Sequence, residues 1–364
     1  MNTSLNFYLK QAQALGATAE KSMSWFDSHE MIRDDLDRAF CGYNELPSAI
    51  PIFGGSGDKF TMVEPWHHIF YEAEQDLDSA ILLLLMGFYK DSFRSIRSFL
   101  ELNVFAFYHF INKDEGDFEK WISGQARTPE LAILLKALNE KNDSFRALNE
   151  LLKWNEQLGV LYVELSGFVH TRGALHTHTS LKNSNQVVFS ETGMQIGSSL
   201  LLRAVRLAGM GFAVNFPMSF QALPRFDKFA FNGPAGGFLS EDQVKRISAI
   251  FPESVAKVIS EICLSNKEAS SLADGIRSMP DLTEQEVFES FNKTLQSKEF
   301  SEIRNEILKM MERGEINKAF SLMEAAQRAQ MRAITGVLFN PFYGEMAKTE
   351  TPQTRRDDDP RECL

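Results

Sequence analysis

Hydrophobic residues recur along most of the chain at the three- and four-residue spacing of an α-helix. The pattern predicts helices over residues 63–86, 91–111, 143–169 and 192–216, each with an apolar stripe that faces a core. Gly87 and its neighbours leave only a very short turn between the first two helices. A turn that short predicts an antiparallel helical hairpin with closely packed helices.

The helical period breaks between residues 174 and 190. Residues 175–181 (LHTHTSL) and 186–190 (QVVFS) flank the polar segment KNSN, which predicts a small β-hairpin. Successive side chains of a strand point to opposite faces, so His176 and His178 would share one face. The predicted fold is mostly α: an antiparallel helical bundle with one small β-hairpin near 174–190 and a second, C-terminal helical unit.

Loop-forming residues indicate where the chain divides. Residues 42–59 contain two prolines and four glycines, and residues 232–237 read NGPAGG. A capping box at Ser240 and Gln243 opens a further helix beyond this boundary. The predicted parts are N-terminal helices and a loop (1–60), a helical core (61–222), a linker (223–239), a C-terminal helical unit (240–346) and a disordered tail (347–364).

The composition indicates a protein of the cytoplasm. The net charge of −11 disfavours sequence-independent binding to nucleic acid and to anionic membranes. The longest apolar run, residues 80–88, is too short to cross a bilayer, and the N-terminus does not resemble a signal peptide. Three widely separated cysteines form no metal-type spacing and suit a reducing compartment. We therefore expect no membrane association and no bound cofactor or metal.

Arg97 and Glu101 lie four residues apart in a helix that is otherwise apolar. At that spacing they share a helix face and can pair. One interpretation is a structural ion pair that joins this helix to the helix predicted over 143–169. The other is a ligand-binding site, in which Glu101 orients the Arg97 guanidinium towards a phosphate or nucleotide.

Basic side chains gather at the end of the helix predicted over 143–169. His170 and Arg172 lie where the negative end of the helix dipole stabilises cations. Arg172 and His178 also form an Arg-x5-His spacing. These residue types suit metal-independent RNA cleavage, because an imidazole can transfer a proton and a guanidinium can stabilise charge on phosphorus. His176 and His178 could instead bind a metal, although no Cys or acidic residue accompanies them at a suitable spacing.

The segments GFYKDSFRSIRSFLEL and YVELSGFVHTRG resemble the HEPN-like superfamily of prokaryotic helical proteins, over roughly residues 63–220. The resemblance implies an antiparallel pair of long helices. Many members look like RNases of toxin and phage-defence systems, with an Arg-x4-to-6-His motif near the end of the last core helix, a spacing that Arg172 and His178 satisfy. In active members that pair lies on helical backbone, whereas the predicted hairpin removes His178 from the helix. Other members look like binding or regulatory modules, and His170 matches their Leu-Ser-x-x-Val-His ending, in which the His is a structural end-cap.

We expect a binding or regulatory helical module, in a bacterial stress or phage-defence system, that acts through self-association or a protein partner. The 30 phenylalanines supply enough apolar surface for a homo-oligomer. The alternative is a metal-independent RNase, a toxin that binds RNA and uses His170, Arg172 and His178. A third hypothesis is a metal-dependent enzyme that uses His176 and His178.

Overall fold

The structure is a computed structural model that describes residues 5–50, 67–112, 120–121, 123–182, 187–230, 237, 239–294 and scattered positions between 305 and 318. These residues are mainly helical. Within them the only β-type pairing is one isolated bridge, between Ala222 and Leu239. The prediction of a mostly α, bundled fold is confirmed.

The chain divides into two compact units. The first comprises residues 1–222 and 236–273, and the second comprises residues 223–235 and 274–364. The segment predicted as the C-terminal unit, 240–346, is therefore shared between them, because its first helices pack with the first unit. The candidate site residues all belong to the first unit.

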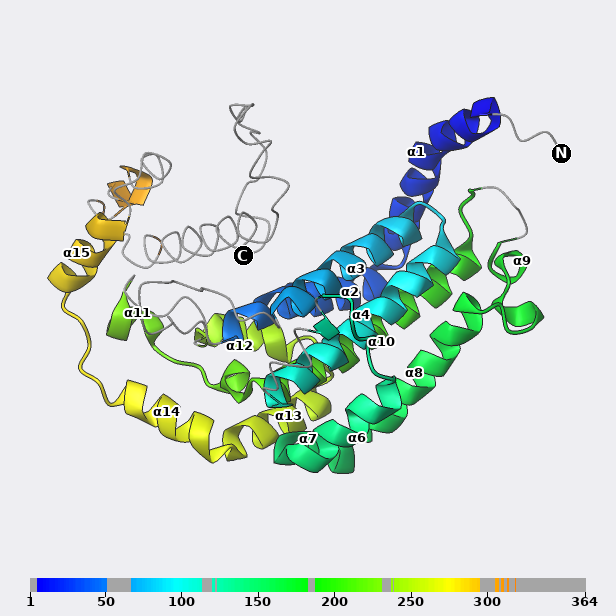
Figure 1. Ribbon diagram of the computed structural model, residues 1–364. Coiled ribbons are helices and arrows are strands. Elements are labelled where there is room, and N and C mark those ends of the chain that lie inside the picture. The colour runs from blue at the N-terminus through cyan, green and yellow to red at the C-terminus, as the bar shows by residue number, and fades with distance from the viewer. Residues whose placement is uncertain are drawn as a thin grey trace. The chain divides into compact units, whose positions relative to one another are not determined.

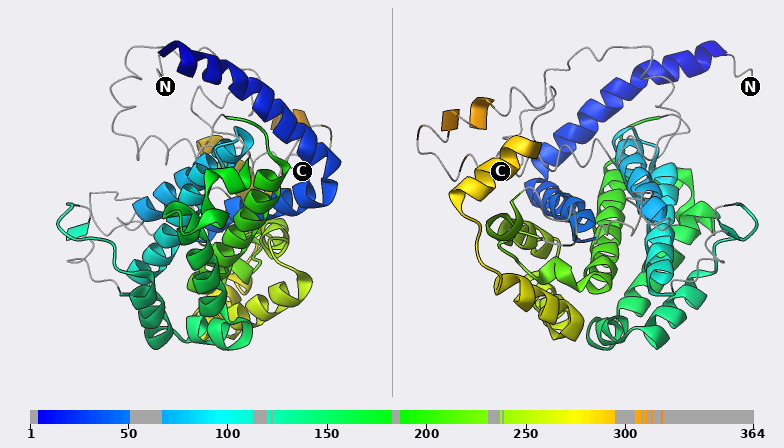
Figure 2. Two further views of the ribbon diagram at one scale, coloured as in Figure 1. Left: turned by 90° about the vertical axis from the view of Figure 1, so that its right-hand side faces the viewer. Right: turned by 60° about the vertical axis from the view of Figure 1, so that its left-hand side comes forward.

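The first unit is built around α4 (Tyr89–Asn112), which runs beside α3 (His67–Leu85) after the short turn at Gly87 (Figure 1, Figure 2). α4 also contacts α6 (Leu131–Lys141), α8 (Trp154–Val169) and α10 (Glu191–Asn215). The helices form because their apolar positions follow the helical period. On α4, five of these positions are at most 1% exposed: Phe93, Ile96, Leu100, Val104 and Phe107. The predicted hairpin of two long helices is confirmed.

The remaining helices of the first unit surround this centre (Figure 1). They are α1 (Leu5–Ser28), α2 (Glu30–Glu45), η1 (Leu46–Ala49), α7 (Asp143–Leu152), η2 (Ala174–His176), α9 (His178–Leu181), η3 (Pro217–Phe220), α12 (Glu241–Ser248) and α13 (Glu253–Ser265). α12 joins α2 through a polar contact: the Glu45 carboxylate accepts from Arg246 Nε and from Gln243 Nε2, each at 2.8 Å. α14 (Lys267–Arg277) crosses the division between the units.

The second unit contains α11 (Arg225–Phe229) and α15 (Glu284–Thr294). The buried Lys228 ammonium lies 2.6 Å from the Asp281 carboxylate and donates to the Met279 carbonyl. The Leu282 amide donates to the Asp227 carbonyl at 2.6 Å. These contacts fasten α11 to the segment that leads into α15.

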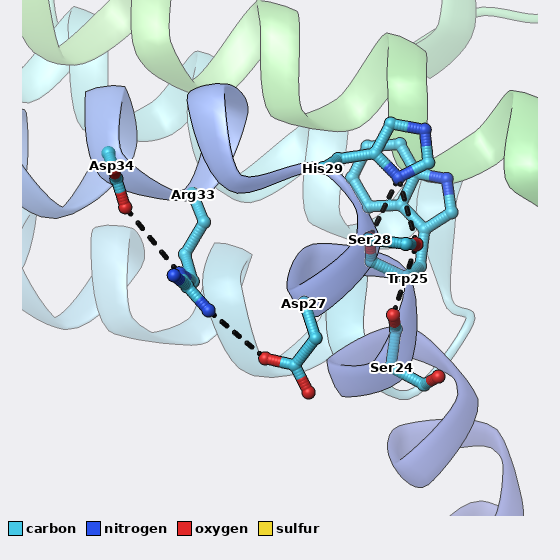
Figure 3. Close-up of polar contacts among 7 residues, drawn as sticks. All are labelled: Ser24, Trp25, Asp27, Ser28, His29, Arg33 and Asp34. Atoms are coloured by element: carbon cyan, nitrogen blue, oxygen red, sulfur yellow. Dashed lines mark hydrogen bonds and ion pairs between the residues drawn. The ribbon is translucent and has the colours of Figure 1, made fainter.

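α1 and α2 are separate helices because the chain turns at His29 (Figure 3). The His29 ring stacks on Trp25, with centroids 4.1 Å apart, and its Nδ1 lies 2.8 Å from the Trp25 carbonyl. Ser28 Oγ donates to the same carbonyl at 2.9 Å. These side chains satisfy a backbone acceptor that the broken helix would otherwise leave open.

The helix predicted over 143–169 is two helices, α7 and α8, and the prediction of one continuous helix is wrong. Lys153 lies between them in the left-handed region, with φ 53°. Its amide donates to the Asn149 carbonyl, while the Asn149 side chain accepts from the Asn155 amide. The turn places the Trp154 indole in the core, where its Nε1 donates to the Leu207 carbonyl at 2.9 Å. An apolar period cannot reveal such a break, because both helices keep the same spacing.

The predicted β-hairpin is wrong over its described residues. Residues 175–181 form η2 and the short helix α9, residues 187–190 contain no strand, and residues 183–186 lie outside the described part. The reason is local hydrogen bonding. Thr177 Oγ1 donates to the Ala174 carbonyl and accepts from the Ser180 amide, which caps α9. Ser and Thr side chains compete in this way with strand pairing.

α10 passes through the middle of the first unit. It is the one helix in the described ranges that is long and apolar enough to cross a bilayer, and 72% of its most apolar window is buried in the bundle. A Cβ added at Gly211 would lie 2.5 Å from Phe107 Cε2, so the glycine permits α10 to approach α4 closely. This helix behaves as a core element of the bundle.

Candidate functional site

Four polar side chains meet between α4 and α8, and we call them the α4–α8 clasp: Arg97, Glu101, Tyr162 and His170. Arg97 donates to Glu101 Oε1 from Nε at 3.2 Å and from Nη2 at 3.0 Å. Nη2 also donates to the Tyr162 hydroxyl at 2.5 Å, which in turn donates to Glu101 Oε1 at 2.6 Å. Nη1 lies 3.2 Å from His170 Nε2. The clasp therefore links the middle of α4 to the C-terminal half of α8.

The contacts within the clasp raise the pKa values of Arg97 and Tyr162 and so keep both groups protonated. Burial lowers the pKa of Arg97, but Glu101 and Tyr162 outweigh burial and raise it. Burial, together with the hydrogen bond and charge of Glu101, raises the pKa of Tyr162. Arg97 thus stays a cation and Tyr162 a neutral phenol. Because a guanidinium can only donate, His170 Nε2 is the acceptor in this contact. Each group has its partner inside the cluster.

The structure brings together three of the residues singled out in the sequence. Arg97 and Glu101 form the expected ion pair, and His170 joins them from the end of α8. Tyr162 was not recognised in the sequence, because a lone tyrosine in an apolar helix carries no spacing signal that links it to another helix. Its hydroxyl makes the ion pair a connection between helices.

Arg172 and His178 are not joined. Arg172 follows α8, where its amide donates to the Gly167 carbonyl at 2.9 Å, and its guanidinium makes no hydrogen bond or ion pair with any described residue. His178 is exposed and is the first residue of α9. The two residues thus lie on different elements, and no hydrogen bond between them orients either one for proton transfer.

His176 packs back onto the end of α8. Its Nδ1 lies 2.6 Å from the Arg172 carbonyl, and its ring lies 4.9 Å from the Phe168 ring. A Cβ added at Gly167 would come within 2.5 Å of this imidazole, so only glycine leaves room for it. The expectation that His176 and His178 share one strand face is wrong, because neither lies on a strand.

Two lysines beside the clasp, Lys90 and Lys182, are almost completely buried, and we call them the lysine pair. Their exposed fractions are 4% and 9%. Lys90 Nζ donates to Thr171 Oγ1 at 2.7 Å, and Lys182 Nζ donates to the Gly87 carbonyl at 3.1 Å. Neither ammonium forms an ion pair with a described carboxylate. Burial lowers the pKa of Lys182, and the charge of Asp91 partly offsets this effect.

His178 lies within electrostatic range of the lysine pair. Burial lowers the pKa of His178 below its ordinary value, and the charges of Lys90, Lys182 and Arg94 lower it further against the opposing charge of Asp91. His178 is therefore a neutral imidazole near pH 7. The sequence did not reveal the lysine pair, because a lysine near a turn ordinarily lies on the surface.

No group of three or more His, Cys, Asp or Glu side chains in the described ranges has the arrangement of a metal site. His67 and His68 open α3, and their side chains lie outside the described part. The described geometry thus offers hydrogen-bonded and charged groups, but no ready set of metal ligands.

Comparisons with protein-family models, with curated proteins and with solved structures gave no match to this chain.

Proposed function

We propose that this chain is a binding or regulatory helical module that acts through self-association, in a bacterial stress or phage-defence system. The closed α4–α8 clasp is the observation that carries the proposal. A catalytic acid or base must reach a substrate proton. The hydrogen bonds of Arg97, Glu101 and Tyr162 instead go to one another and to His170. These groups are therefore not directed at a substrate. The resemblance of residues 63–220 to HEPN-like proteins is consistent with a module of this kind.

The outer face of α8 supports self-association. Val160 and Val163 are 57% and 61% exposed. Gly159 lies beside them, and a Cβ added there would meet nothing within 4 Å. A glycine in a helix interior costs roughly 1 kcal/mol relative to alanine, and no contact with a described residue requires it at position 159. A small residue next to exposed valines suits close approach by another helix.

Charge favours a second copy of α8 in antiparallel orientation as that other helix. Glu156 lies exposed near the N-terminal end of α8, whereas Arg172 follows its C-terminal end. If two copies cross between Val160 and Val163, the acidic end of each faces the basic end of the other. Both ends then gain an opposite charge, as complementary interfaces do.

The test is the oligomeric state of the full chain, measured by light scattering across a range of protein concentrations. We expect the wild type to form a dimer and the double variant Val160→Glu/Val163→Glu to be monomeric with unchanged helix content. Ile133→Glu is the matched control, because Ile133 is also an exposed apolar residue, at 57%, but lies on α6. A monomeric wild type, or a double variant that still dimerises, would contradict the proposal.

The second candidate function is metal-independent RNA cleavage. The observation that favours it is the exposed Arg172 guanidinium, which has no partner among the described residues, together with His178, whose lowered pKa leaves it able to accept a proton near pH 7. In that hypothesis His178 or His170 is the general base, and Arg172 stabilises the charge that develops on phosphorus.

An RNA-cleavage assay separates the two functions. Purified protein is incubated with tRNA and total RNA, beside the variants His170→Ala, His178→Ala and Arg172→Ala. Arg146→Ala, which removes an exposed arginine of α7, is the control. We expect no cleavage by any of these proteins. Cleavage by the wild type and the control that the three variants lose would overturn the non-catalytic proposal.

We also propose that the protein acts in the cytoplasm, with a second copy or another protein as its partner. This location rests on the sequence features alone. RNA would be a partner only if the second candidate function, metal-independent RNA cleavage, were correct.

A further inference from the structure

The lysine pair has more positive charge than its surroundings balance. Each ammonium has three N–H donors, and each uses one of them on a neutral oxygen: Thr171 Oγ1 for Lys90 and the Gly87 carbonyl for Lys182. Burying a charge without an opposite charge costs several kcal/mol. Both groups lie at the turn before α4, because Lys182 contacts the carbonyl of Gly87, three residues before Lys90, and the charges of both act on His178.

Helix dipoles compensate part of this charge. Lys182 binds just beyond the C-terminal end of α3, and Lys90 binds just beyond the C-terminal end of α8. The end of each helix is equivalent to roughly half a negative charge. Two such ends therefore leave about one positive charge unbalanced. Lys90 also lies in the first turn of α4, where the helix dipole is positive and disfavours it further.

The neighbouring side chains do not supply the missing negative charge. Asp91 is the acidic group that faces His178 and Lys182, but its carboxylate accepts from Arg94 at 2.6 Å. The Asp91–Arg94 pair is neutral as a whole. Helix dipoles explain why each lysine is tolerated, but not the charge that remains.

We propose that the lysine pair is the base of a binding site for a small oxyanion of the phosphate or sulfate class, with His178 at its edge. The anion would accept from the donors that Lys90 and Lys182 leave unused, and its charge would balance the surplus. Charge-assisted hydrogen bonds of this kind are about twice as strong as neutral ones. The anion is either free in solution or the terminal group of a phosphate monoester.

The full chain, exchanged into chloride buffer, tests the site by calorimetric titration and thermal unfolding. The probes are inorganic phosphate, sulfate and glycerol phosphate, each compared with sodium chloride at equal ionic strength. We expect saturable binding, and a rise in Tm of about 4 °C at a probe concentration near 100 times its Kd. Protection by the monoester and not by inorganic phosphate would identify an ester as the ligand, and protection by both would identify the free anion as sufficient.

The double variant Lys90→Met/Lys182→Met removes both ammonium groups while keeping side chains of similar length. It should bind at least about tenfold more weakly, and the single variant Lys90→Met should lie between it and the wild type. Lys136→Met is the matched control, because Lys136 is 76% exposed on α6 and should leave binding unchanged. Equal binding by the double variant and the wild type, or no saturable binding by the wild type, would overturn the site.

The ionisation of His178 gives a second measurement that does not depend on the lysine variants. In an NMR titration, a bound anion should raise the pKa of His178 back towards or above its ordinary value, whereas chloride should not. An unchanged His178 pKa at saturation would place the anion elsewhere. The Val160→Glu/Val163→Glu variant should still bind the anion, so a failure of this site and a failure of self-association are distinguishable.

Discussion

The α4–α8 clasp and the lysine pair meet at consecutive residues, since Arg97 contacts His170 and Lys90 contacts Thr171. Their energetics differ. In the clasp, the Arg97 guanidinium and the Glu101 carboxylate are half-buried and in direct contact. Their other hydrogen bonds go to Tyr162 and His170, the remaining members of the clasp. In the lysine pair, two cations are more deeply buried and have only neutral oxygens as partners. The charges of the clasp balance one another, whereas those of the lysine pair have no opposite charge in direct contact among the described residues.

The comparison shows that buried charges can either stabilise or destabilise the same bundle. Where opposite charges and hydrogen bonds converge, removing one member leaves others unsatisfied, so the cluster stabilises the fold. Where charges of one sign converge, the fold would be more stable without them, and their presence indicates a ligand. Variants of the two clusters should therefore change stability in opposite directions.

The largest expected effect is on the clasp. Glu101→Ala removes the acceptor of two Arg97 hydrogen bonds and one from Tyr162, and should lower the free energy of unfolding by about 2–3 kcal/mol. Urea denaturation measures the change. Glu140→Ala, which breaks an exposed pair with Lys136, should change stability by less than about 0.5 kcal/mol. Equal effects of the two variants would show that the clasp contributes no more than a surface pair.

Tyr162→Phe keeps the ring but removes the hydroxyl that accepts from Arg97 and donates to Glu101. It should lower the free energy of unfolding by about 1.5 kcal/mol in the same urea experiment. Tyr108→Phe is the control, because the Tyr108 hydroxyl makes no hydrogen bond with a described residue. If both variants were neutral, the hydroxyl would not connect the two helices energetically.

Lys90→Met should act in the opposite direction. It removes a buried ammonium, and its one acceptor, the Thr171 hydroxyl, belongs to an exposed residue and can turn to water. In phosphate-free buffer we expect the free energy of unfolding to rise by about 1 kcal/mol, while the exposed Lys136→Met leaves it unchanged. A loss of stability similar to that of Glu101→Ala would make the lysine pair a second structural clasp.

The smallest expected effect is the pH dependence from His178. Its pKa is lowered in the folded state, so the unfolded chain binds more protons between that lowered pKa and the ordinary value of about 6.5. Stability should therefore rise with pH through this window and fall on acidification from the ordinary pKa down through the lowered one. His178→Gln should lose this contribution, and saturating phosphate should reduce it. Identical pH profiles of the variant and the wild type would contradict the prediction.

The sequence predicted those parts of the molecule that depend on spacing along one helix. The period of apolar residues placed α3, α4 and α10, and the spacing of Arg97 and Glu101 placed their ion pair. It did not predict contacts that join distant segments, such as the Tyr162 hydroxyl in the clasp or the burial of Lys182 against the turn at Gly87. Such contacts depend on which helices pack together, and neither spacing nor composition contains that information.

Two local predictions failed because short-range hydrogen bonds outweighed periodicity. Alternating Thr and His residues resemble a strand, but the Thr177 hydroxyl caps α9. A continuous apolar period suggested one helix over 143–169, but Lys153 adopts a left-handed conformation that directs Trp154 into the core. In both places one residue changes the direction of the chain while the surrounding pattern stays the same.

The close contact between Gly167 and the His176 ring makes one position of α8 a control point for the segment that follows it. A single methyl group there, in Gly167→Ala, would displace an imidazole without altering any charge. The His176 ring packs against Phe168 and its Nδ1 lies close to the Arg172 carbonyl, so the displacement would remove both contacts at the end of α8. The order of the segment between α8 and α9 thus depends on the absence of a side chain at one position of α8.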